Sequence, residues 1–190
     1  MKDKNKNLAT DISTDLDKFG HGLIEHDGHV GDILDYIKEL GLDKNTIVIY
    51  TTDNGPEQST WPDAGVTQFR GEKMTTYEGG VRAPFLVRWP GKIPAGLKRN
   101  GISAHEDVVP TIMAAVGETN IIEDLKKGKK FGDKNFKVHL DGYNNLDFWT
   151  GKTDKSARNH FFYYYESGLT AIRVGPWKMH FPLEKNTTPI

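Results

Sequence analysis

An apolar, β-branched run that ends abruptly in an acid, an amide and a glycine constrains the fold of this chain more than any other feature. The run covers residues 46–52, and Asp53, Asn54 and Gly55 follow it directly. It predicts a strand with a polar end, and ligands bind at the strand ends of open α/β sheets. A carboxylate beside a carbonyl oxygen suits a hard cation such as Ca²⁺. The alternative is a hairpin, because Asn-Gly is a favoured two-residue turn, although no second strand follows at once.

A helix and a short turn are expected before this strand. Apolar residues recur with the spacing of one helix face over residues 27–40, and Gly41 supplies a left-handed stop. The helix is expected to start near Leu16 or Phe19, and residues 43–45 form the turn into the strand. Helix, turn and strand make half of a βαβ unit, which favours a mostly parallel sheet.

The remaining pattern changes from α/β to antiparallel β along the chain. A second strand is predicted over residues 83–89, with Pro84 at its beginning because proline has no N–H to donate. Asp107 is expected to cap a helix over residues 108–116. Beyond it we expect a helical turn and loop, then an antiparallel meander, over residues 121–137, 161–165, 170–174 and 177–181. We therefore predict an α/β domain over residues 1–117 and a small antiparallel subdomain over 118–190.

Composition excludes several classes of function. The 190 residues contain 25 Lys and Arg against 26 Asp and Glu, with the two signs interspersed. This balance argues against a nucleic-acid partner and against an anionic membrane surface. No apolar run reaches the ~18 residues of a membrane span, and the polar N-terminus lacks the apolar stretch of a signal peptide. The chain has no cysteine, so it contains no disulfide, thiolate metal site or cysteine nucleophile.

The loop over residues 69–82 is the second stretch that suggests chemistry. It carries three cations, and Lys73 is suited to place a charge on a phosphate or sulfate oxygen. The alternative is a solvated loop with paired charges. His26 and His29 share a helix face but lack a third metal ligand nearby, so a solvated face is the better interpretation. Glu57 and Glu78 are candidate paired acids, although no spacing forces them together.

Together these stretches resemble the sulfatase family, and bacterial arylsulfatases in particular. The resemblance runs in order from about Phe19 to Phe181. Its specificity lies in the ordered series rather than in any one motif. The matching stretches are residues 27–31, 40–41, 45–56, 61–65, 69–73, 77–84, 88–91, 107–111, 140–144, 172–173 and 177–178.

The resemblance implies an alkaline-phosphatase-like core with a mostly parallel sheet, followed by an antiparallel C-terminal subdomain. It implies hydrolysis of sulfate esters by a formylglycine nucleophile, made from the Cys or Ser of a Cys/Ser-x-Pro-x-Arg motif, with Ca²⁺ as the usual cation. Asp53 and Asn54 match one pair of the family's metal ligands. Lys73 matches the lysine that contacts the sulfate, a catalytic and substrate-binding role.

This chain departs from the family in one large respect. It has no Cys/Ser-x-Pro-x-Arg, so it lacks the formylglycine, and the family's other ligands correspond to a region before Met1. We expect the C-terminal portion of a Ca²⁺-dependent arylsulfatase that is inactive alone, binds Ca²⁺ weakly and needs the N-terminal sulfatase part as its partner. An uncovered sheet edge is expected to drive self-association. Analogy with the family predicts a periplasmic or secreted location.

Two alternatives remain at this point. The first is a fragment of a related phosphodiesterase or phosphonate hydrolase, and the second is a non-catalytic truncated domain. The stretch over residues 61–65 favours the sulfatase over the first alternative. A genuine start at Met1, with no nucleophile motif encoded upstream, would favour the second.

Overall fold

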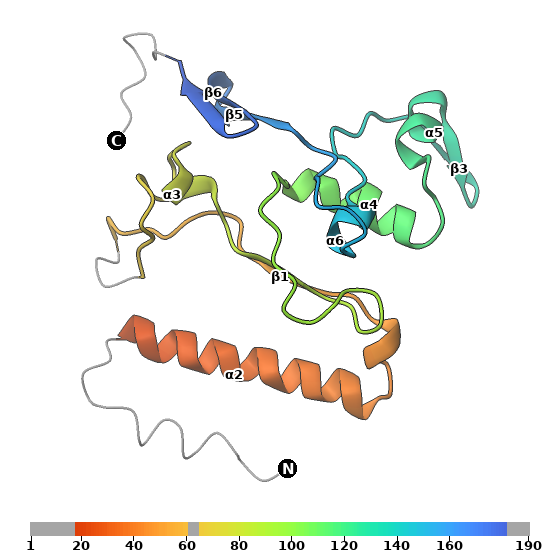
Figure 1. Ribbon diagram of the computed structural model, residues 1–190, viewed down its shortest axis with the longest axis horizontal. Coiled ribbons are helices and arrows are strands. Elements are labelled where there is room, and N and C mark those ends of the chain that lie inside the picture. Colours follow the sequence, from red (N-terminus) through yellow and green to blue (C-terminus); the bar gives the residue numbers. More distant parts are fainter. Residues whose placement is uncertain (1–17, 61–64, 182–190) are drawn as a thin grey trace. The chain divides into compact units, whose positions relative to one another are not determined.

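The computed structural model describes residues 18–60 and 65–181, and the chain divides into two compact units. The first unit extends to Pro90 and the second begins at Gly91. Figure 1 traces both along the sequence. The predicted boundary between residues 117 and 118 falls inside the second unit, so a division at that point stays a prediction. No helix in the described ranges is long and apolar enough to cross a membrane.

Helix α2 (Lys18–Glu39) opens the first unit and confirms the predicted helix, with a start near Phe19. Its end is the expected left-handed stop. Gly41 has φ +68°, its N–H donates to Lys38 O, and the next residue, Leu42, donates to Ile37 O. This pair of hydrogen bonds forms a Schellman motif, whose left-handed residue glycine adopts without strain. The 3₁₀ turn η1 (Asp43–Asn45) then leads into the first strand, as predicted.

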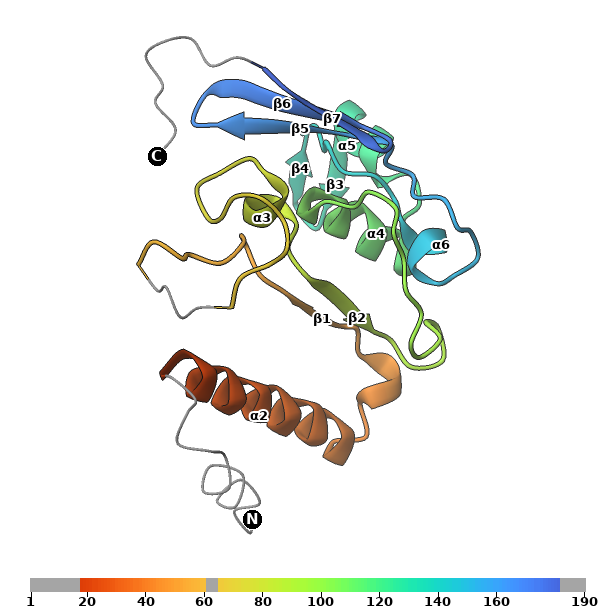
Figure 2. The same cartoon turned by 60° about the vertical axis from the view of Figure 1, so that its left-hand side comes forward.

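Strands β1 (Val48–Thr51) and β2 (Phe85–Arg88) form an antiparallel pair, with Thr51 opposite Phe85. Figure 2 shows the two side by side. The expected parallel arrangement does not occur among the described strands. A parallel neighbour needs a crossover of a dozen or more residues, usually a helix, and the only described helix between these strands is the single turn α3 (Glu78–Val81). The Asn54–Gly55 hairpin is excluded as well, since the partner of β1 starts at Phe85.

The second unit holds the buried hydrophobic residues of the described chain. Its helices are η2 (His105–Asp107), α4 (Val108–Ala115), α5 (Ile121–Lys127) and α6 (Leu146–Trp149). Helix α4 contacts both α5 and α6. The fully or nearly buried apolar side chains are Ala114, Ile121, Leu125, Phe148, Trp149, Tyr163 and Ala171. Residues on both sides of position 117 therefore share one core.

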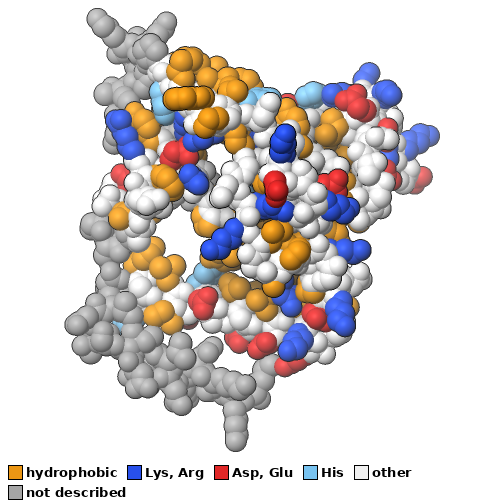
Figure 3. All heavy atoms as spheres, in the orientation of Figure 1, with side chains coloured by type: hydrophobic (Ala, Val, Ile, Leu, Met, Phe, Trp, Pro, Cys, Tyr) orange, Lys and Arg blue, Asp and Glu red, His pale blue; other side chains and the backbone are white. Residues whose placement is uncertain are grey.

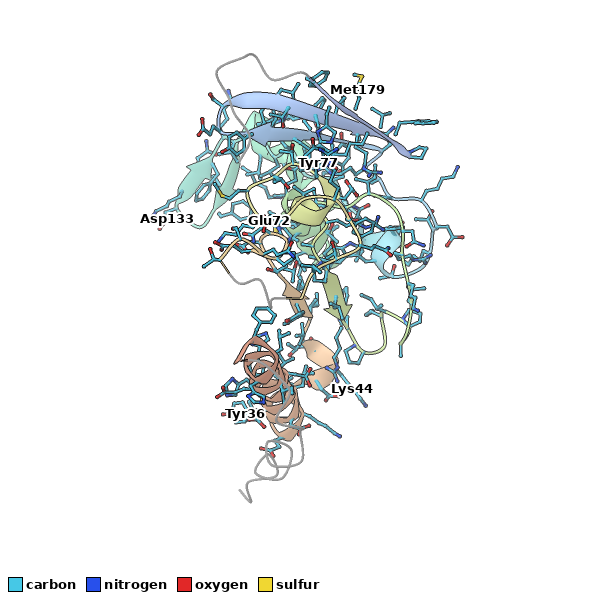
Figure 4. The ribbon with its side chains drawn as sticks, turned by 90° about the vertical axis from the view of Figure 1, so that its left-hand side faces the viewer. Tyr36, Lys44, Glu72, Tyr77, Asp133 and Met179 are labelled. Carbon is cyan, nitrogen blue, oxygen red and sulfur yellow. The ribbon has the colours of Figure 1, made fainter. Side chains whose placement is uncertain are left out.

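A β-hairpin occupies part of the region for which we predicted a loop. Strands β3 (Lys129–Phe131) and β4 (Lys134–Phe136) pair antiparallel, with Phe131 opposite Lys134. Gly132 and Asp133 alone make the turn, and Gly132 has φ +58°. Asp133 is labelled at this turn in Figure 4. The loop prediction was wrong because Gly-Asp is a two-residue hairpin signal that the surrounding lysines disguised.

The C-terminal meander is confirmed. Strands β5 (His160–Tyr165), β6 (Gly168–Val174) and β7 (Trp177–His180) form an antiparallel sheet in that order. One face is buried at Tyr163 and Ala171. The other face exposes large apolar side chains, and Figure 3 shows hydrophobic side chains gathered over this part of the chain. Those exposed by 40% or more are Phe162, Tyr164, Leu169, Val174, Trp177 and Met179.

A buried ion pair ties the second unit together. Asp107 is fully buried, and its carboxylate accepts hydrogen bonds from the Arg158 guanidinium at 2.7–3.1 Å and from the N–H of Tyr143 at 2.8 Å. Asn145 donates to the same carboxylate at 3.2 Å. Burial opposes the charge of Arg158, but the hydrogen bonds and charges of Asp107 and Glu106 raise the pKa of Arg158 above its ordinary value.

Asp107 stands at the position predicted for the cap of α4, but its side chain makes no capping bond to that helix. Its carboxylate instead accepts the N–H of Ala104, at the start of the preceding 3₁₀ turn, at 2.9 Å. The predicted helix is confirmed over Val108–Ala115, and Gly117 follows it with φ +98°. The carboxylate therefore serves the buried network rather than α4.

Candidate functional site

Asp53 and Asn54 lie immediately beyond the end of β1, as the sequence predicts. Asp53 is exposed and Asn54 is half-buried. The amide nitrogen of Asn54 donates to Gly55 O at 2.7 Å, which leaves the amide oxygen as its acceptor group. The strand end thus offers a carboxylate and a carbonyl oxygen on consecutive residues.

Lys73 is held by an acid that the sequence did not assign to it. Lys73 Nζ donates to Glu57 Oε2 at 2.7 Å, with the two side chains 40% and 35% exposed. This hydrogen bond is the largest cause that raises the pKa of Lys73, and the negative charge of Asp53 contributes a smaller part. The same bond is the largest cause that lowers the pKa of Glu57. Lys73 therefore remains a cation in the electrostatic range of Asp53.

A second acid, Glu72, lies next to Lys73 in the chain and binds the segment that carries Glu57. The carboxylate of Glu72 accepts the N–H groups of Gln58 and Ser59 at 2.5 and 3.0 Å. The N–H of Lys73 donates to Pro56 O at 2.9 Å. Figure 4 labels Glu72 and Tyr77 on the segment that leads into α3. We call residues 53–60 the acid loop and residues 70–80 the lysine loop.

Glycines let the backbone pack closely between the acid loop and the lysine loop at Gly55, and within the lysine loop at Gly79 and Gly80. A Cβ on Gly55 would lie 1.7 Å from Gly79 O, and one on Gly80 would lie 2.4 Å from both Glu72 O and Thr75 O. The Gly55 N–H donates to Gly80 O across the two loops, and the Gly79 N–H donates to Arg70 O within the lysine loop, each at 2.8 Å. Glycine at these positions is a requirement of close approach rather than of an unusual dihedral angle.

Gly55→Ala is expected to separate the two loops. The added methyl group cannot share space with Gly79 O, and overpacking of this kind costs roughly 1–3 kcal/mol. Amide hydrogen exchange of Lys73 and Gly79 should accelerate, because both N–H groups donate within this packing. Gly31→Ala in α2 is the control, since it meets nothing within 4 Å and should stabilise the helix by roughly 0.5–1 kcal/mol. Unchanged exchange in Gly55→Ala would contradict the close approach.

Other candidates from the sequence lie apart from this arrangement. Glu57 and Glu78 each pair with a cation rather than with each other. Glu78 pairs with Arg82 at 3.9 Å, and Glu57 pairs with Lys73. His26 lies 3.1 Å from the Tyr50 hydroxyl. Among the residues that the structure describes, no three His, Asp or Glu side chains form a metal-binding group. The role of Glu57 was missed because a separation of sixteen residues carries no periodic signal.

The donor set of the strand end fits a hard cation in kind but is incomplete in number. A carboxylate and an amide oxygen are the ligand types of Ca²⁺, which takes six to eight oxygen ligands. Asp53 and Asn54 are the two such residues at the end of β1. With the ammonium of Lys73 close by, the arrangement is suited to an anion that bridges a cation and a lysine.

Comparison with known proteins places these residues in context. A family model described as Sulfatase matches residues 2–118, which include both site loops. The arylsulfatase of Hemicentrotus pulcherrimus is 32% identical over 169 residues, which cover 88% of this chain and 28% of that protein. Arylsulfatase A of Homo sapiens is 37% identical over 169 residues, covering 86% of this chain and 30% of the relative.

Solved structures agree with the sequence matches. The crystal structure of the PsFucS1 sulfatase from Pseudoalteromonas sp. superposes with a TM-score of 0.71 at 32% identity, covering 84% of this chain and 30% of that one. The chain therefore spans less than a third of the length of the relatives that it matches. Its fold is that of one part of such proteins.

Proposed function

This chain belongs to the sulfatase family, and from that premise we propose that it forms the C-terminal portion of a Ca²⁺-dependent sulfatase that hydrolyses aryl sulfate esters. The general reaction, hydrolysis of a sulfuric ester, is the one named for its relatives. We assign metal binding to Asp53 and Asn54, and contact with the sulfate group to Lys73. The chain alone is inactive in this proposal, because it contains no Cys/Ser-x-Pro-x-Arg from which a formylglycine arises.

The observation that carries the proposal is the packing of the acid loop against the lysine loop. Asp53 and Asn54 supply two oxygen ligands, and Lys73, about twenty residues later, supplies the ammonium. Hydrogen bonds hold the two segments together. A solvated loop with randomly paired charges requires no glycine contacts of this closeness. Preorganised charge is the property that stabilises a developing anion.

The residues of this chain act on the sulfate by charge and position. Lys73 donates to a sulfuryl oxygen and offsets the negative charge that grows there in the transition state. Asp53 and Asn54 would hold the cation, which would supply further positive charge to the same group. The proton of Lys73 stays on its nitrogen, because its surroundings raise the pKa of the ammonium. Lys73 is therefore an electrostatic group and not a general acid in this proposal.

The metal assignment is tested on the complete enzyme that contains this chain. Asp53→Ala removes a charged ligand and is expected to lower Ca²⁺ affinity by at least ~10-fold, within the range by which ligand charge and number tune calcium sites. Calorimetric titration with Ca²⁺ measures the affinity, and hydrolysis of an aryl sulfate gives the activity. Asp124→Ala on α5 is the control, because Asp124 pairs with Lys129 in the other unit.

Two results would count against the proposed function. Equal Ca²⁺ affinity in Asp53→Ala and Asp124→Ala would remove Asp53 from the metal site. Faster turnover of a phosphate diester than of an aryl sulfate by the complete enzyme would favour the phosphodiesterase alternative.

The wider setting of the chain is part of the proposal. We place β1 in a mostly parallel sheet that the rest of the protein completes, since most side chains of β1 and β2 are only half-buried. The N-terminal sulfatase part is then the partner of the first unit. Without it, the apolar surface of this unit would drive self-association. An exported location remains a prediction from the family.

A further inference from the structure

We propose that Glu57 is a positioning residue that directs the ammonium of Lys73 toward its anion. This inference rests on the proposed function and adds a residue to it. Glu57 follows the metal-ligand pair by three positions and meets Lys73 across the packed loops. In the proposed site it acts through the lysine rather than by contact with the sulfate.

The geometry gives Glu57 a fixed direction. Its Oε1 accepts a hydrogen bond from the Thr60 hydroxyl at 2.7 Å, and its Oε2 accepts Lys73 at 2.7 Å. Each carboxylate oxygen therefore has one partner, Thr60 from the same acid loop and Lys73 from the lysine loop. Because both oxygens of Glu57 are hydrogen-bonded, its carboxylate has a restricted orientation. The position of the carboxylate therefore restricts the position of the Lys73 ammonium.

Glu72 fixes the loop on which Glu57 stands. Its carboxylate binds the N–H groups of the two residues that follow Glu57, while Glu57 binds the side chain that follows Glu72. The two acids thus form a reciprocal clamp between the acid loop and the lysine loop. The backbone of Lys73 is held by the bond from its N–H to Pro56 O, and its ammonium is held by Glu57.

The clamp leaves Lys73 able to bind an anion. An ammonium has three N–H donors, and Glu57 uses one of them at a half-exposed site. The ammonium keeps two further donors for an anion. A lysine side chain loses much rotamer freedom when it binds, and prior restraint by Glu57 reduces that loss for the sulfate.

A local pair in the same chain shows what an ordinary surface ion pair lacks. Glu123 and Lys126 on α5 lie 2.8 Å apart, and the hydrogen bond between them is the largest cause that lowers the pKa of Glu123. They are three residues apart on one helix, whereas Glu57 and Lys73 join two loops. Similar bond length with different connectivity makes Glu123 a matched control.

The first experiment measures the reactivity of individual lysines in the 190-residue chain. An amine-acylating reagent is applied under limiting conditions, and the rate at each lysine is followed by peptide mass spectrometry. Glu57→Gln should raise the acylation rate of Lys73 by about 2- to 5-fold, the range that an exposed charge-assisted pair supports, and leave Lys126 unchanged. Glu123→Gln should do the reverse. Thr60→Val keeps the carboxylate and should raise the Lys73 rate by a smaller factor.

The second experiment is a double-variant cycle in the complete enzyme. Glu57→Gln should lower kcat/KM for an aryl sulfate by about 3- to 10-fold, in line with the partial loss of one oriented contact. In a Lys73→Ala background the same change should have no further effect, because a positioning residue acts through the residue that it positions.

The outcomes separate this inference from the proposed function. An unchanged Lys73 acylation rate in Glu57→Gln, or a further loss of kcat/KM on top of Lys73→Ala, would overturn the positioning role. If Lys73→Ala leaves turnover intact while Glu57→Gln still frees Lys73 to acylation, the clamp stands and the assigned sulfate contact fails. A faster Lys73 acylation in Glu57→Gln, together with no further loss of kcat/KM on top of Lys73→Ala, supports both the positioning role of Glu57 and the sulfate contact of Lys73.

Discussion

Lys73→Ala in the complete enzyme is expected to lower kcat/KM for an aryl sulfate by at least ~10-fold, because removal of a preorganised donor to a developing oxyanion costs an enzyme about 10²–10³ in kcat in well-studied cases. The lower bound reflects the half exposure of this lysine, where solvent screens its charge. Steady-state hydrolysis measures the effect. The loss should appear mainly in kcat, since the contact strengthens as charge develops on the sulfuryl oxygen.

The control for this variant is Lys126→Ala, which removes a lysine paired with an acid in the other unit. It should leave kcat and KM unchanged. Equal kinetics for Lys73→Ala and Lys126→Ala would remove Lys73 from the site and leave the chain without an identified sulfate contact.

Asp107→Ala is expected to destabilise the second unit by about 3–5 kcal/mol, the cost of removing one partner of a buried ion pair. The substitution leaves the Arg158 guanidinium, 3% exposed, with Glu106 as its remaining acidic partner. It also removes the acceptor of the Tyr143 and Ala104 N–H groups. Urea unfolding, monitored by circular dichroism, measures the change in free energy of unfolding from the shift of the urea midpoint, provided that the m-value is unchanged.

Two comparison variants sharpen the stability prediction. Asp147→Ala on α6 removes an exposed ion pair with Lys152 and should shift the unfolding midpoint little. Asp107→Asn keeps the shape and loses the charge, so it should fall between the wild type and Asp107→Ala. A midpoint for Asp107→Ala equal to that of Asp147→Ala would show that the buried pair contributes nothing to stability.

Local chemistry made much of this fold predictable from the sequence. The helix before β1 was predictable because its apolar residues repeat with helical spacing and Gly41 closes it. The C-terminal meander was predictable because aromatic and β-branched runs alternate with glycine-containing turns. The position of Asp53 and Asn54 followed from the strand that precedes them.

The errors came from contacts between distant residues. The direction of β2 depends on how the connecting loops return, and no local pattern encodes that direction. Asp107 was read as a helix cap because its sequence neighbours favour one, while its real partner is Arg158, far along the chain. Glu57 likewise takes its role from a lysine on another loop. Such pairings are fixed by tertiary structure rather than by propensity.

The reciprocal clamp has a consequence for the length of chain that can connect the two loops. Because Glu57, Glu72 and the Lys73 N–H hold both loops, the segment between them is anchored at each end. Each doubling of such a segment costs only about 0.6 kcal/mol in closure entropy. A longer connection between the two loops is therefore expected to cost little free energy, because the contacts that hold Lys73 lie in the loops themselves.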